Sequence, residues 1–469
     1  MNTNYNIMLF GLNQVGSNFA REFMRYLSCY DESTIKVCFV DHTKVSESDL
    51  SNHYFIEKDI GWNKAATMKM VWDVNFNRNS SKIKIEAYKQ KLSGLNVARS
   101  LLRNIQGGYY SSNSTHVNLY LVCTLDKQER QSIMGVFQED RNAIAIVYNK
   151  KGFNISIRSN GADVICYTKP CQVRAANDLG TALGHAHLLL AQVVNLMSNL
   201  KLNTDNIVYD RKNLASGLAN MFSTAIGENE QHFSTEGKTA IVCVGTGGTG
   251  GNFCKDIIKL MKQKEDMILI MIDGDRVEEK NCIRQPFSSH DLMQYKADVL
   301  RAQLIRDYPE LEHQIFSYPL YIDTVEQLDD CVNFFQVQNL ILVGCVDNHR
   351  ARQVMHQYYD RKETILYLDS ANEFSVGEVV VSIKLKGVEC SPLRSYYYPD
   401  VLTDQSPSAS ELSCGVVNQS SPQHQVTNVM AAHILITLLE DVVNKGVLHG
   451  GIVYFDSFAF FTRFQPCEC

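Results

Sequence analysis

Several features that would assign the chain to a large class of proteins are missing from its 469 residues. No run of about 20 consecutive apolar residues occurs, so the sequence predicts no membrane-spanning helix. The amino terminus lacks the basic segment and long apolar stretch of a secretory signal. The formal charge of −6 gives no general attraction for phosphate backbones or anionic lipid, so neither nucleic acid nor a membrane is an expected partner.

The 14 cysteines include no C-x-x-C pair. Pairs of that kind are typical of structural zinc sites, so zinc is not expected. Cys38, Cys123, Cys243 and Cys345 lie in or beside apolar runs, where cysteine acts as a small hydrophobic residue. The chain is also long for a secreted protein built around disulfides. The sequence therefore predicts free thiols and a cytoplasmic protein.

Short apolar runs alternate with helical stretches along the whole chain, an order typical of parallel sheets covered by helices on both faces. Segments of the first half also align with segments of the second, with an offset that changes only from 245 − 11 = 234 to 347 − 126 = 221. The aligned pairs are 11–19 with 245–253, 39–55 with 271–287, and 121–134 with 342–355. We therefore expect an α/β fold of two tandem Rossmann-like domains, 1–226 and 239–469, joined by a linker at 227–238.

The two halves differ where a Rossmann domain holds a phosphate. The second half has Gly247 and Gly248, whereas the first has Asn13 and Gln14, whose side chains take up space that a phosphate needs. We therefore expect the second half to bind a nucleotide and the first half to be degenerate. Three further polar positions differ in the same way: Asn281, Arg284 and Gln285 stand where the first half has Asp49, Asn52 and His53.

The glycine-rich turn alone is weak evidence for a particular nucleotide. Gly245–Gly250 follows an expected strand and precedes an expected helix, a context in which phosphate binds the helix N-terminus. Asp273, at the end of the next strand, is placed to bond a ribose hydroxyl. These features fit NAD as well as ATP.

The residues that follow favour ATP. Arg284 and Lys296 provide cations for the charge that develops on a triphosphate when its α-phosphorus is attacked. Asp347, after another strand, can hold Mg²⁺ through one oxygen. NAD chemistry needs neither the cations nor the metal. The other polar residues of this set are Asp275, Asn281, Gln285, Asn348, Arg350 and Arg352.

The pattern GxGGxG … DxDxVxxxNxxRQ … K … DN resembles the ThiF/MoeB/HesA family, which includes the ubiquitin-activating enzymes. The resemblance spans about residues 238–440 and, weakly, 5–200. Members use MgATP to adenylate the carboxyl-terminal glycine of a ubiquitin-like protein and release pyrophosphate. The resemblance implies that Asp273 binds the ribose and that Asp347 holds magnesium. The phosphate contacts that it implies are Gly245, Gly247, Gly248, Gly250, Asn281, Arg284 and Lys296.

One intact half beside one degenerate half resembles the eukaryotic members, in which an inactive adenylation domain packs against an active one. We expect the same intrachain pseudo-dimer of ThiF-type domains here. Dimers of the family often lend an arginine from near one partner's amino terminus. The first twenty residues of this chain contain no arginine, so Arg21 and Arg25 are the remaining, weak candidates.

Cys414 is the expected nucleophile for a thioester. It lies in a Ser-rich crossover loop, expected at about 390–422, before the last long helix, as the catalytic cysteine does in family members that have one. A thiolate there would attack the acyl adenylate. Cys390 is the competing candidate, and Cys171 precedes the matching helix of the first half. His424 would be able to lower the pKa of the thiol.

The sequence therefore predicts an enzyme that activates a ubiquitin-like protein with ATP and Mg²⁺ and passes it from Cys414 to a conjugating-enzyme-like protein. Three alternatives stay open. Adenylation without a thioester would serve a sulfur carrier, a small peptide or tRNA. An NAD-dependent oxidoreductase would be stabilised by NAD(H) and not by MgATP. A non-catalytic scaffold would be stabilised by neither.

Overall fold

The chain forms two compact units in the computed structural model. Unit 1 comprises Met1–Asp210 and Ser216–Ser223, and unit 2 comprises Arg211–Ala215 and Thr224–Cys469. The expected domain limits and linker stay predictions. The described residues are 3–30, 33–76, 82–106, 115–140, 143–150, 152–159, 162–165, 178–198, 207–210, 215–218, 230–405, 424–459 and 461–467.

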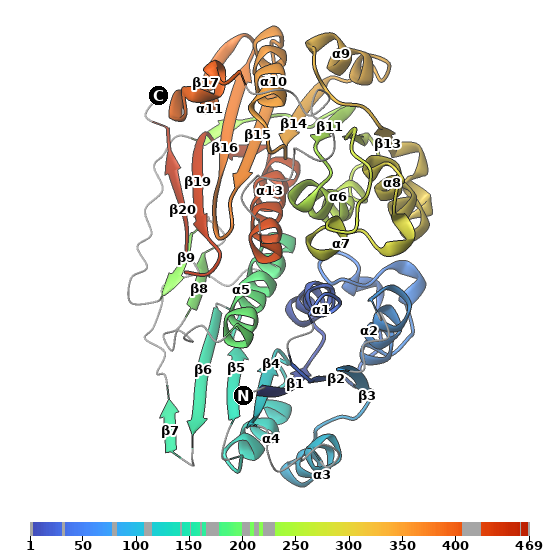
Figure 1. The fold of residues 1–469 in the computed structure, drawn as a ribbon, viewed down its shortest axis with the longest axis vertical. Coiled ribbons are helices and arrows are strands. Elements are labelled where there is room, and N and C mark those ends of the chain that lie inside the picture. Colours follow the sequence, from blue (N-terminus) through green and yellow to red (C-terminus); the bar gives the residue numbers. More distant parts are fainter. Residues whose placement is uncertain are drawn as a thin grey trace. The chain divides into compact units, whose positions relative to one another are not determined.

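Unit 2 contains a mainly parallel sheet with helices on both faces (Figure 1). Its strands are β10 (Glu230–His232), β11 (Thr239–Val244), β12 (Met267–Ile272), β13 (Ile315–Tyr318), β14 (Asn339–Gly344), β15 (Ile365–Asn372), β16 (Val376–Leu385), β17 (Val388–Ser391), β18 (Val447–His449), β19 (Gly451–Asp456) and β20 (Phe461–Pro466). Its helices are α6 (Gly248–Met261), α7 (Asn281–Arg284), α8 (Lys296–Asp307), α9 (Val325–Asn333), α10 (His349–Arg361), α11 (Arg394–Tyr397), α12 (Asp400–Thr403) and α13 (Gln425–Lys445).

The sheet of unit 2 runs in the order β13-β12-β11-β14-β15-β16-β19-β20, and its first five strands are parallel. All six residues of β11, β12 and β14 are buried, as expected for strands covered on both faces. β16, β19 and β20 continue the sheet antiparallel. The mainly parallel α/β class predicted from the apolar runs is therefore confirmed.

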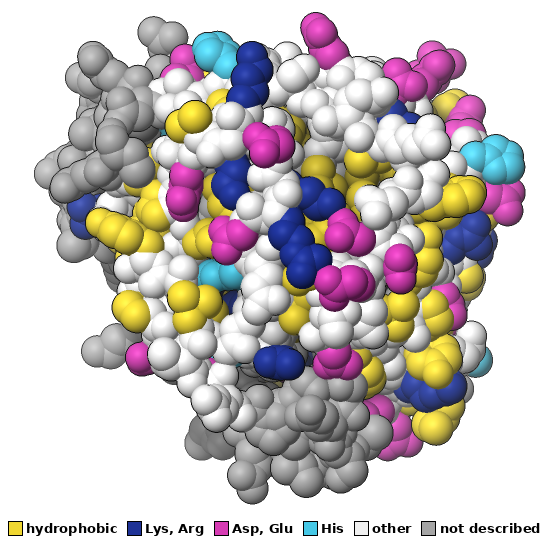
Figure 2. Space-filling view, turned by 90° about the horizontal axis from the view of Figure 1, so that it is seen from above, with side chains coloured by type: hydrophobic (Ala, Val, Ile, Leu, Met, Phe, Trp, Pro, Cys, Tyr) yellow, Lys and Arg dark blue, Asp and Glu magenta, His cyan; other side chains and the backbone are white. Residues whose placement is uncertain are grey.

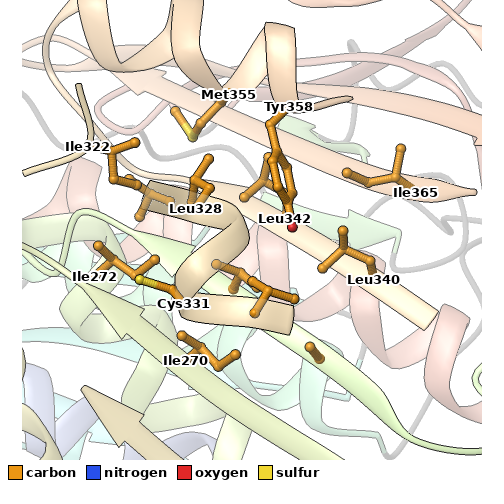
Figure 3. Close-up of a cluster of buried hydrophobic side chains, with 14 of the residues drawn as sticks. Ile270, Ile272, Ile322, Leu328, Cys331, Leu340, Leu342, Met355, Tyr358 and Ile365 are labelled. Carbon is orange, nitrogen blue, oxygen red and sulfur yellow. The ribbon is translucent and has the colours of Figure 1, made fainter. Parts of the chain in front are cut away.

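Alternate side chains of these strands face α9 and α10 on one side of the sheet (Figure 3). In this cluster Ile270 and Ile272 of β12 and Leu342 of β14 meet Leu328 of α9 and Tyr358 of α10. The helices α6 and α13 pack against each other elsewhere in the unit. The core therefore fixes the carboxyl ends of the parallel strands, where the α6 turn begins.

Local sequence sets the limits of these helices. Asn348 begins α10 because its side chain accepts a hydrogen bond from the Ala351 N–H. Thr324 begins α9 through a capping box with Gln327. Gly446 ends α13 in the left-handed region, with φ +65°, which glycine adopts at little cost.

Unit 1 has the same strand order as unit 2. Its parallel strands run β3-β2-β1-β4-β5, followed by the antiparallel β6 and then by β7 and β8. Helices α3 and α4 cover one face, and α1 packs against α5. The elements are β1 (Thr3–Phe10), α1 (Gln14–Leu27), β2 (Ile35–Val40), α2 (Lys64–Val71), β3 (Ile83–Tyr88), α3 (Leu95–Gln106), β4 (Thr115–Val122), α4 (Lys127–Phe137), β5 (Ala143–Tyr148), β6 (Gly152–Ser159), β7 (Ala162–Ile165), α5 (Leu179–Met197) and β8 (Ile207–Asp210). The residues of β9 (Ala215–Leu218) are divided between the two units.

The helices α5 and α13 are long and apolar enough to cross a membrane by length and composition, although the sequence predicts no membrane-spanning segment. In each, 94% of the apolar window is buried in the folded chain. Burial of this kind is typical of a core helix, so we assign both to the protein interior. The ten cysteines within the described ranges are all free thiols, as the sequence predicts.

Leu342→Ala is expected to lower the free energy of unfolding by about 2–5 kcal/mol, because it leaves a cavity beneath α9 and α10. Leu342 is fully buried. Urea unfolding followed by circular dichroism measures the change. Leu402→Ala is the matched control, since Leu402 is 55% exposed and should shift the value by less than about 0.5 kcal/mol. Equal effects of the two changes would contradict this assignment of the core.

Candidate nucleotide site

The turn between β11 and α6 is shaped by glycines. Gly245 has φ +86°, and a Cβ there would lie 2.5 Å from the Cys345 carbonyl oxygen. A Cβ on Gly250 would collide with the Gly245 carbonyl oxygen, so this glycine allows the helix to approach the strand. Gly247 occupies the N-cap position of α6 and has no side chain to cap it. The first turn of α6 therefore begins without a side-chain acceptor for its N–H groups.

The matching turn of unit 1 is closed by its own side chain. Gly11, with φ +89°, and Gly16 repeat the geometry of Gly245 and Gly250. Asn13, however, caps α1: its Oδ1 accepts hydrogen bonds from Val15 N (3.1 Å) and Gly16 N (3.0 Å). An asparagine oxygen thus takes the place where a phosphate oxygen would bind a helix N-terminus. This contrast supports the prediction that unit 1 is degenerate.

In unit 2 a cavity of about 480 Å³ opens at the uncapped end of α6. Carboxyl ends of parallel strands and the turn after β11 form its walls, where ligands bind in open α/β sheets. Figure 2 shows basic and acidic side chains gathered near the centre of the face at the top of Figure 1. Eleven residues of the predicted set line the cavity: Gly245, Gly247, Gly248, Asp273, Asp275, Arg284, Gln285, Lys296, Asp347, Asn348 and Arg352.

Asp273 anchors the glycine-rich turn. Its Oδ2 accepts hydrogen bonds from the Thr246 backbone N (2.6 Å) and Oγ1 (3.0 Å), and its Oδ1 accepts one from the Asp275 N–H (2.9 Å). Burial raises the pKa of Asp273 above its ordinary value in spite of the charge of Lys296. Asp41 of unit 1 holds Leu12 N in the same way, at 2.6 Å. The carboxylate therefore has a structural task in both units, in addition to the ribose contact predicted in unit 2.

Lys296 and Asp275 form an ion pair at the cavity wall. The Lys296 Nζ lies 2.7 Å from Asp275 Oδ2, and the Tyr321 hydroxyl donates to Asp275 Oδ1 at 2.6 Å. Burial raises the pKa of Asp275, but the charge of Lys296 and these hydrogen bonds outweigh it, so the pKa lies below its ordinary value. Burial lowers the pKa of Lys296, but Asp273 and Asp275 outweigh it and raise the pKa. The pair stays charged at neutral pH.

Arg284 and Asp347 approach the cavity from two different elements. Arg284 ends α7, and Asp347 follows β14. Burial lowers the pKa of Arg284, and the charge of Asp347 opposes this effect. Two buried cavity atoms, Gln285 Oε1 and Ser370 Oγ, have no hydrogen-bond partner among the described residues. The wall therefore combines cations, six carboxylates, of which Asp347 and Glu373 are exposed, and polar atoms without a partner in the described part of the chain, which fits a polyphosphate with its metal ion.

The residues fit Mg²⁺ better than a metal held by protein ligands alone. Within the described ranges, no group of three or more His, Cys, Asp or Glu side chains can hold a metal ion. Mg²⁺ usually takes one or two carboxylates and completes its shell with water and substrate phosphates. Asp347 supplies such a carboxylate, and the ion would neutralise phosphate charge there.

Three residues of the predicted set lie outside the cavity wall, and a fourth lines it with its charge engaged elsewhere. Gly250 serves the packing of α6 on β11. Asn281 is buried and accepts from the Glu278 N–H, so it shapes the turn before Arg284. Arg352 lines the cavity, but its guanidinium is buried against Asp369 (3.2 Å) and donates to the Val346 carbonyl oxygen, which braces the loop before Asp347. The remaining one, Arg350, is exposed and does not line the cavity.

Strand register corrects the alignment of the two halves at Asp347. Phe10 pairs with Val122 in unit 1, and the equivalent Val244 pairs with Gly344 in unit 2. Counting three residues on from each partner places Leu125, and not Asp126, at the position of Asp347. Asp126 corresponds to Asn348, and both residues cap the helix that follows. Unit 1 therefore also lacks the predicted metal-binding carboxylate.

The predicted thioester residues fall in two groups. Cys414 and Cys171 lie outside the described residues. Cys390 is half-buried at β17 and does not line the cavity. His424 caps α13, because its Nδ1 accepts from Val426 N, and burial lowers its pKa to about 4. Its effect on a thiol stays a prediction.

The two weak candidates for a lent arginine are engaged within α1. Arg21 lies 2.5 Å and Arg25 3.1 Å from oxygens of Glu22. A contribution of either side chain to the nucleotide site stays a prediction.

Several wall residues escaped the sequence analysis. Tyr321 and Asp323 follow β13, and Asn372 ends β15, all positions after parallel strands that the general rule for α/β sites covers. Thr249, His349 and Glu378 also line the cavity. No sequence motif marks Glu378 as a cavity residue. Its side chain on β16 forms an ion pair with Arg394 of α11 (2.6 Å), a contact that only the folded structure shows.

The sequence profile described as the ThiF family matches residues 220–468. No curated protein sequence matches the chain. Among solved structures, selenomethionine PaaA is 16% identical over 49% of this chain and 64% of its own, with a TM-score of 0.34. MccB of E. coli with ATP is 17% identical over 48% of this chain and 63% of its own, with a TM-score of 0.36. The chain thus covers less than two thirds of either protein.

Gly247→Asn is expected to close the cavity to phosphate while the fold survives. A Cβ at Gly247 would lie 3.5 Å from Gln285 Nε2, an ordinary contact, so asparagine fits. Its Oδ1 would then cap α6 as Asn13 caps α1. We expect binding of a non-hydrolysable ATP analogue with Mg²⁺ to weaken at least about tenfold in isothermal titration calorimetry.

Gly247→Ala is the matched control, because it adds the same Cβ without an oxygen. Its affinity should stay within about threefold of the parent chain. If the asparagine and alanine variants bind the analogue equally well, capping does not explain the difference between the units.

Proposed function

The chain belongs to the ThiF family, and we propose that unit 2 is an ATP-dependent adenylating enzyme. It transfers AMP from MgATP to the free carboxyl terminus of a protein or peptide. A carboxylate oxygen attacks the α-phosphorus, the bond from that phosphorus to the bridging oxygen breaks, and pyrophosphate leaves. The single observation that carries the proposal is the uncapped α6 turn of unit 2, whose counterpart in unit 1 is capped by Asn13.

Four features of the cavity have a task in this reaction. The first turn of α6, beginning at Gly248, offers backbone N–H groups to the phosphates. Lys296 and Arg284 stabilise the charge that moves onto the leaving pyrophosphate. Asp347 would hold Mg²⁺, which supplies further neutralisation of phosphate charge. A hydride-transfer reaction has no use for this combination of cations and carboxylate, which favours ATP over NAD.

We propose as the finer function that the substrate is a ubiquitin-like protein with a carboxyl-terminal glycine. The acyl group then passes from AMP to the Cys414 thiolate: a thioester bond forms, the mixed anhydride bond breaks, and AMP leaves. A conjugating-enzyme-like protein would take the acyl group in turn. The resemblance of the Ser-rich segment around Cys414 to the family's crossover loop supports this step. Adenylation without a thioester is the alternative.

We also propose that unit 1 is a degenerate copy of unit 2 that supports it within one chain. The common strand order and the repeated glycine geometry at Gly11 and Gly245 support a shared origin. The changes at Asn13 and Leu125 support the loss of nucleotide binding in unit 1.

Asp347→Asn should remove the gain in affinity that Mg²⁺ gives to a non-hydrolysable ATP analogue. The parent chain should bind the analogue at least about tenfold more tightly with Mg²⁺ than with a chelator, whereas the variant should bind equally under both conditions. Asp330→Asn, at an exposed position on α9, should behave like the parent chain. A full Mg²⁺ effect in the Asp347 variant would contradict the metal assignment.

Cys414→Ala should separate the two proposed steps. After incubation with MgATP and a lysate of its own source, the parent chain should carry a small protein that intact-mass spectrometry detects and added thiol releases. The variant should lose this adduct and still produce the adenylated small protein. Cys390→Ala is the control, and an adduct that persists without Cys414 but disappears without Cys390 would move the thioester to β17.

A further inference from the structure

The cavity extends to both sides of the α6 N-terminus. On one side lie residues that follow β12 and β13, among them Asp273, Asp275 and Tyr321. On the other side lie residues at the end of β15 and the start of β16, among them Asn372 and Glu378. The sheet order β13-β12-β11-β14-β15-β16 separates these two arms by β11, from which α6 starts. If Asp273 marks the nucleoside arm, the arm at β15 is left for the acyl substrate.

Three neutral polar side chains meet at the base of this second arm. Thr249, in the first turn of α6, donates from Oγ1 to Asn372 Oδ1 at 3.1 Å. Asn428, in the first turn of α13, donates from Nδ2 to Thr249 Oγ1 at 3.4 Å. Thr249 and Asn372 line the cavity, whereas Asn428 is fully buried behind them. This order of donors fixes which end of the Asn372 amide accepts, and hence how the amide is oriented.

At the three equivalent positions of unit 1, none of the residues is the one found in unit 2. Val15 follows Gln14 in the first turn of α1, as Thr249 follows Gly248 in α6. Ala182 lies four residues after the N-cap Asp178, as Asn428 lies four residues after the N-cap His424. Continuing the register of β5 and β15 places Lys150 at Asn372. The polar trio is therefore present in the unit with the open α6 turn and replaced in the unit with the capped turn.

The Asn428 side chain limits the size of residue 248. A Cβ on Gly248 would lie 2.6 Å from the Asn428 Cγ, so a side chain at 248 requires a smaller residue at 428. Unit 1 has this combination, with Gln14 at the first position and Ala182 at the second. A buried amide that restricts the phosphate turn to glycine would be a poor choice for packing alone. Its retention is explained if its hydrogen bond to Thr249 serves the reaction.

We propose that the Asn372 amide Nδ2 holds the carboxylate of the acyl substrate, and the acyl oxygen of the adenylate formed from it, with Thr249 and Asn428 as the positioning residues that orient this amide. This assignment rests on the proposed function. An amide N–H holds a carboxylate by a hydrogen bond without placing a cation beside its attacking oxygen. The cations Lys296 and Arg284 are then kept for the phosphates. The substrate class is a free carboxyl terminus, and the trio makes no contact that requires a particular side chain.

The test compares two probes on the full chain by isothermal titration calorimetry. One is a non-hydrolysable ATP analogue with Mg²⁺, and the other is 5′-O-(N-glycylsulfamoyl)adenosine, a stable mimic of a glycyl adenylate. Thr249→Val and Asn428→Ala introduce the residues that unit 1 has. Each variant should bind the acyl mimic at least about tenfold more weakly than the parent chain does, and should change the affinity for the ATP analogue by less than about twofold. Thr249→Ser keeps the hydroxyl and should bind the mimic like the parent chain.

The assignment is overturned if Thr249→Val and Asn428→Ala lose affinity for both probes equally, or if they lose affinity for neither. Circular dichroism and the melting temperature show whether a variant is folded, and Thr249→Val, nearly isosteric with the parent residue, keeps the test valid if Asn428→Ala fails to fold. A parent chain that binds the ATP analogue but not the acyl mimic overturns this inference and leaves adenine-nucleotide binding intact. A parent chain that binds neither probe overturns the proposed function itself.

Discussion

The site depends on the unsatisfied N–H groups in the first turn of one helix. Buried backbone donors must find acceptors, and a glycine at the N-cap supplies none. In unit 2 this demand falls on whatever fills the cavity beside Gly247, whereas in unit 1 Asn13 meets it from within. The other features of the turn serve this arrangement: Gly245 bends the chain, Gly250 lets the helix approach, and Asp273 holds Thr246 in place.

The sequence predicts well what is encoded locally. The glycine turn, the carboxylate after the second strand and the lysine at the start of α8 lie close in sequence to the elements that position them, and all reach one cavity. Repetition of the pattern also predicts the common strand order of the two units. The alignment failed at Asp347 because two aspartates one position apart look equivalent in sequence, and only strand pairing identifies Leu125 as the true counterpart.

Long-range contacts account for most of the remaining errors. Arg352 lines the cavity, but its charge is engaged in a contact that the sequence did not reveal: Asp369 is fully buried and needs cationic partners, which Arg352 and Arg394 provide. The charges of these two arginines outweigh burial and keep the pKa of Asp369 below its ordinary value. Thr249 and Asn428 are 179 residues apart in the chain, so no motif links them. Residues of this kind become visible only once the fold brings them together.

The spatial exclusion between Gly248 and Asn428 has a consequence for how such a site changes over generations. Enlarging residue 248 alone produces a collision, and shrinking residue 428 alone removes the support of Thr249. The effect of a substitution at either position thus depends on the residue at the other, so the two positions are epistatic. A copy that has reached the state of Gln14 and Ala182 cannot return by a single substitution. Once closed, a unit of this fold is free to specialise in some task other than nucleotide binding.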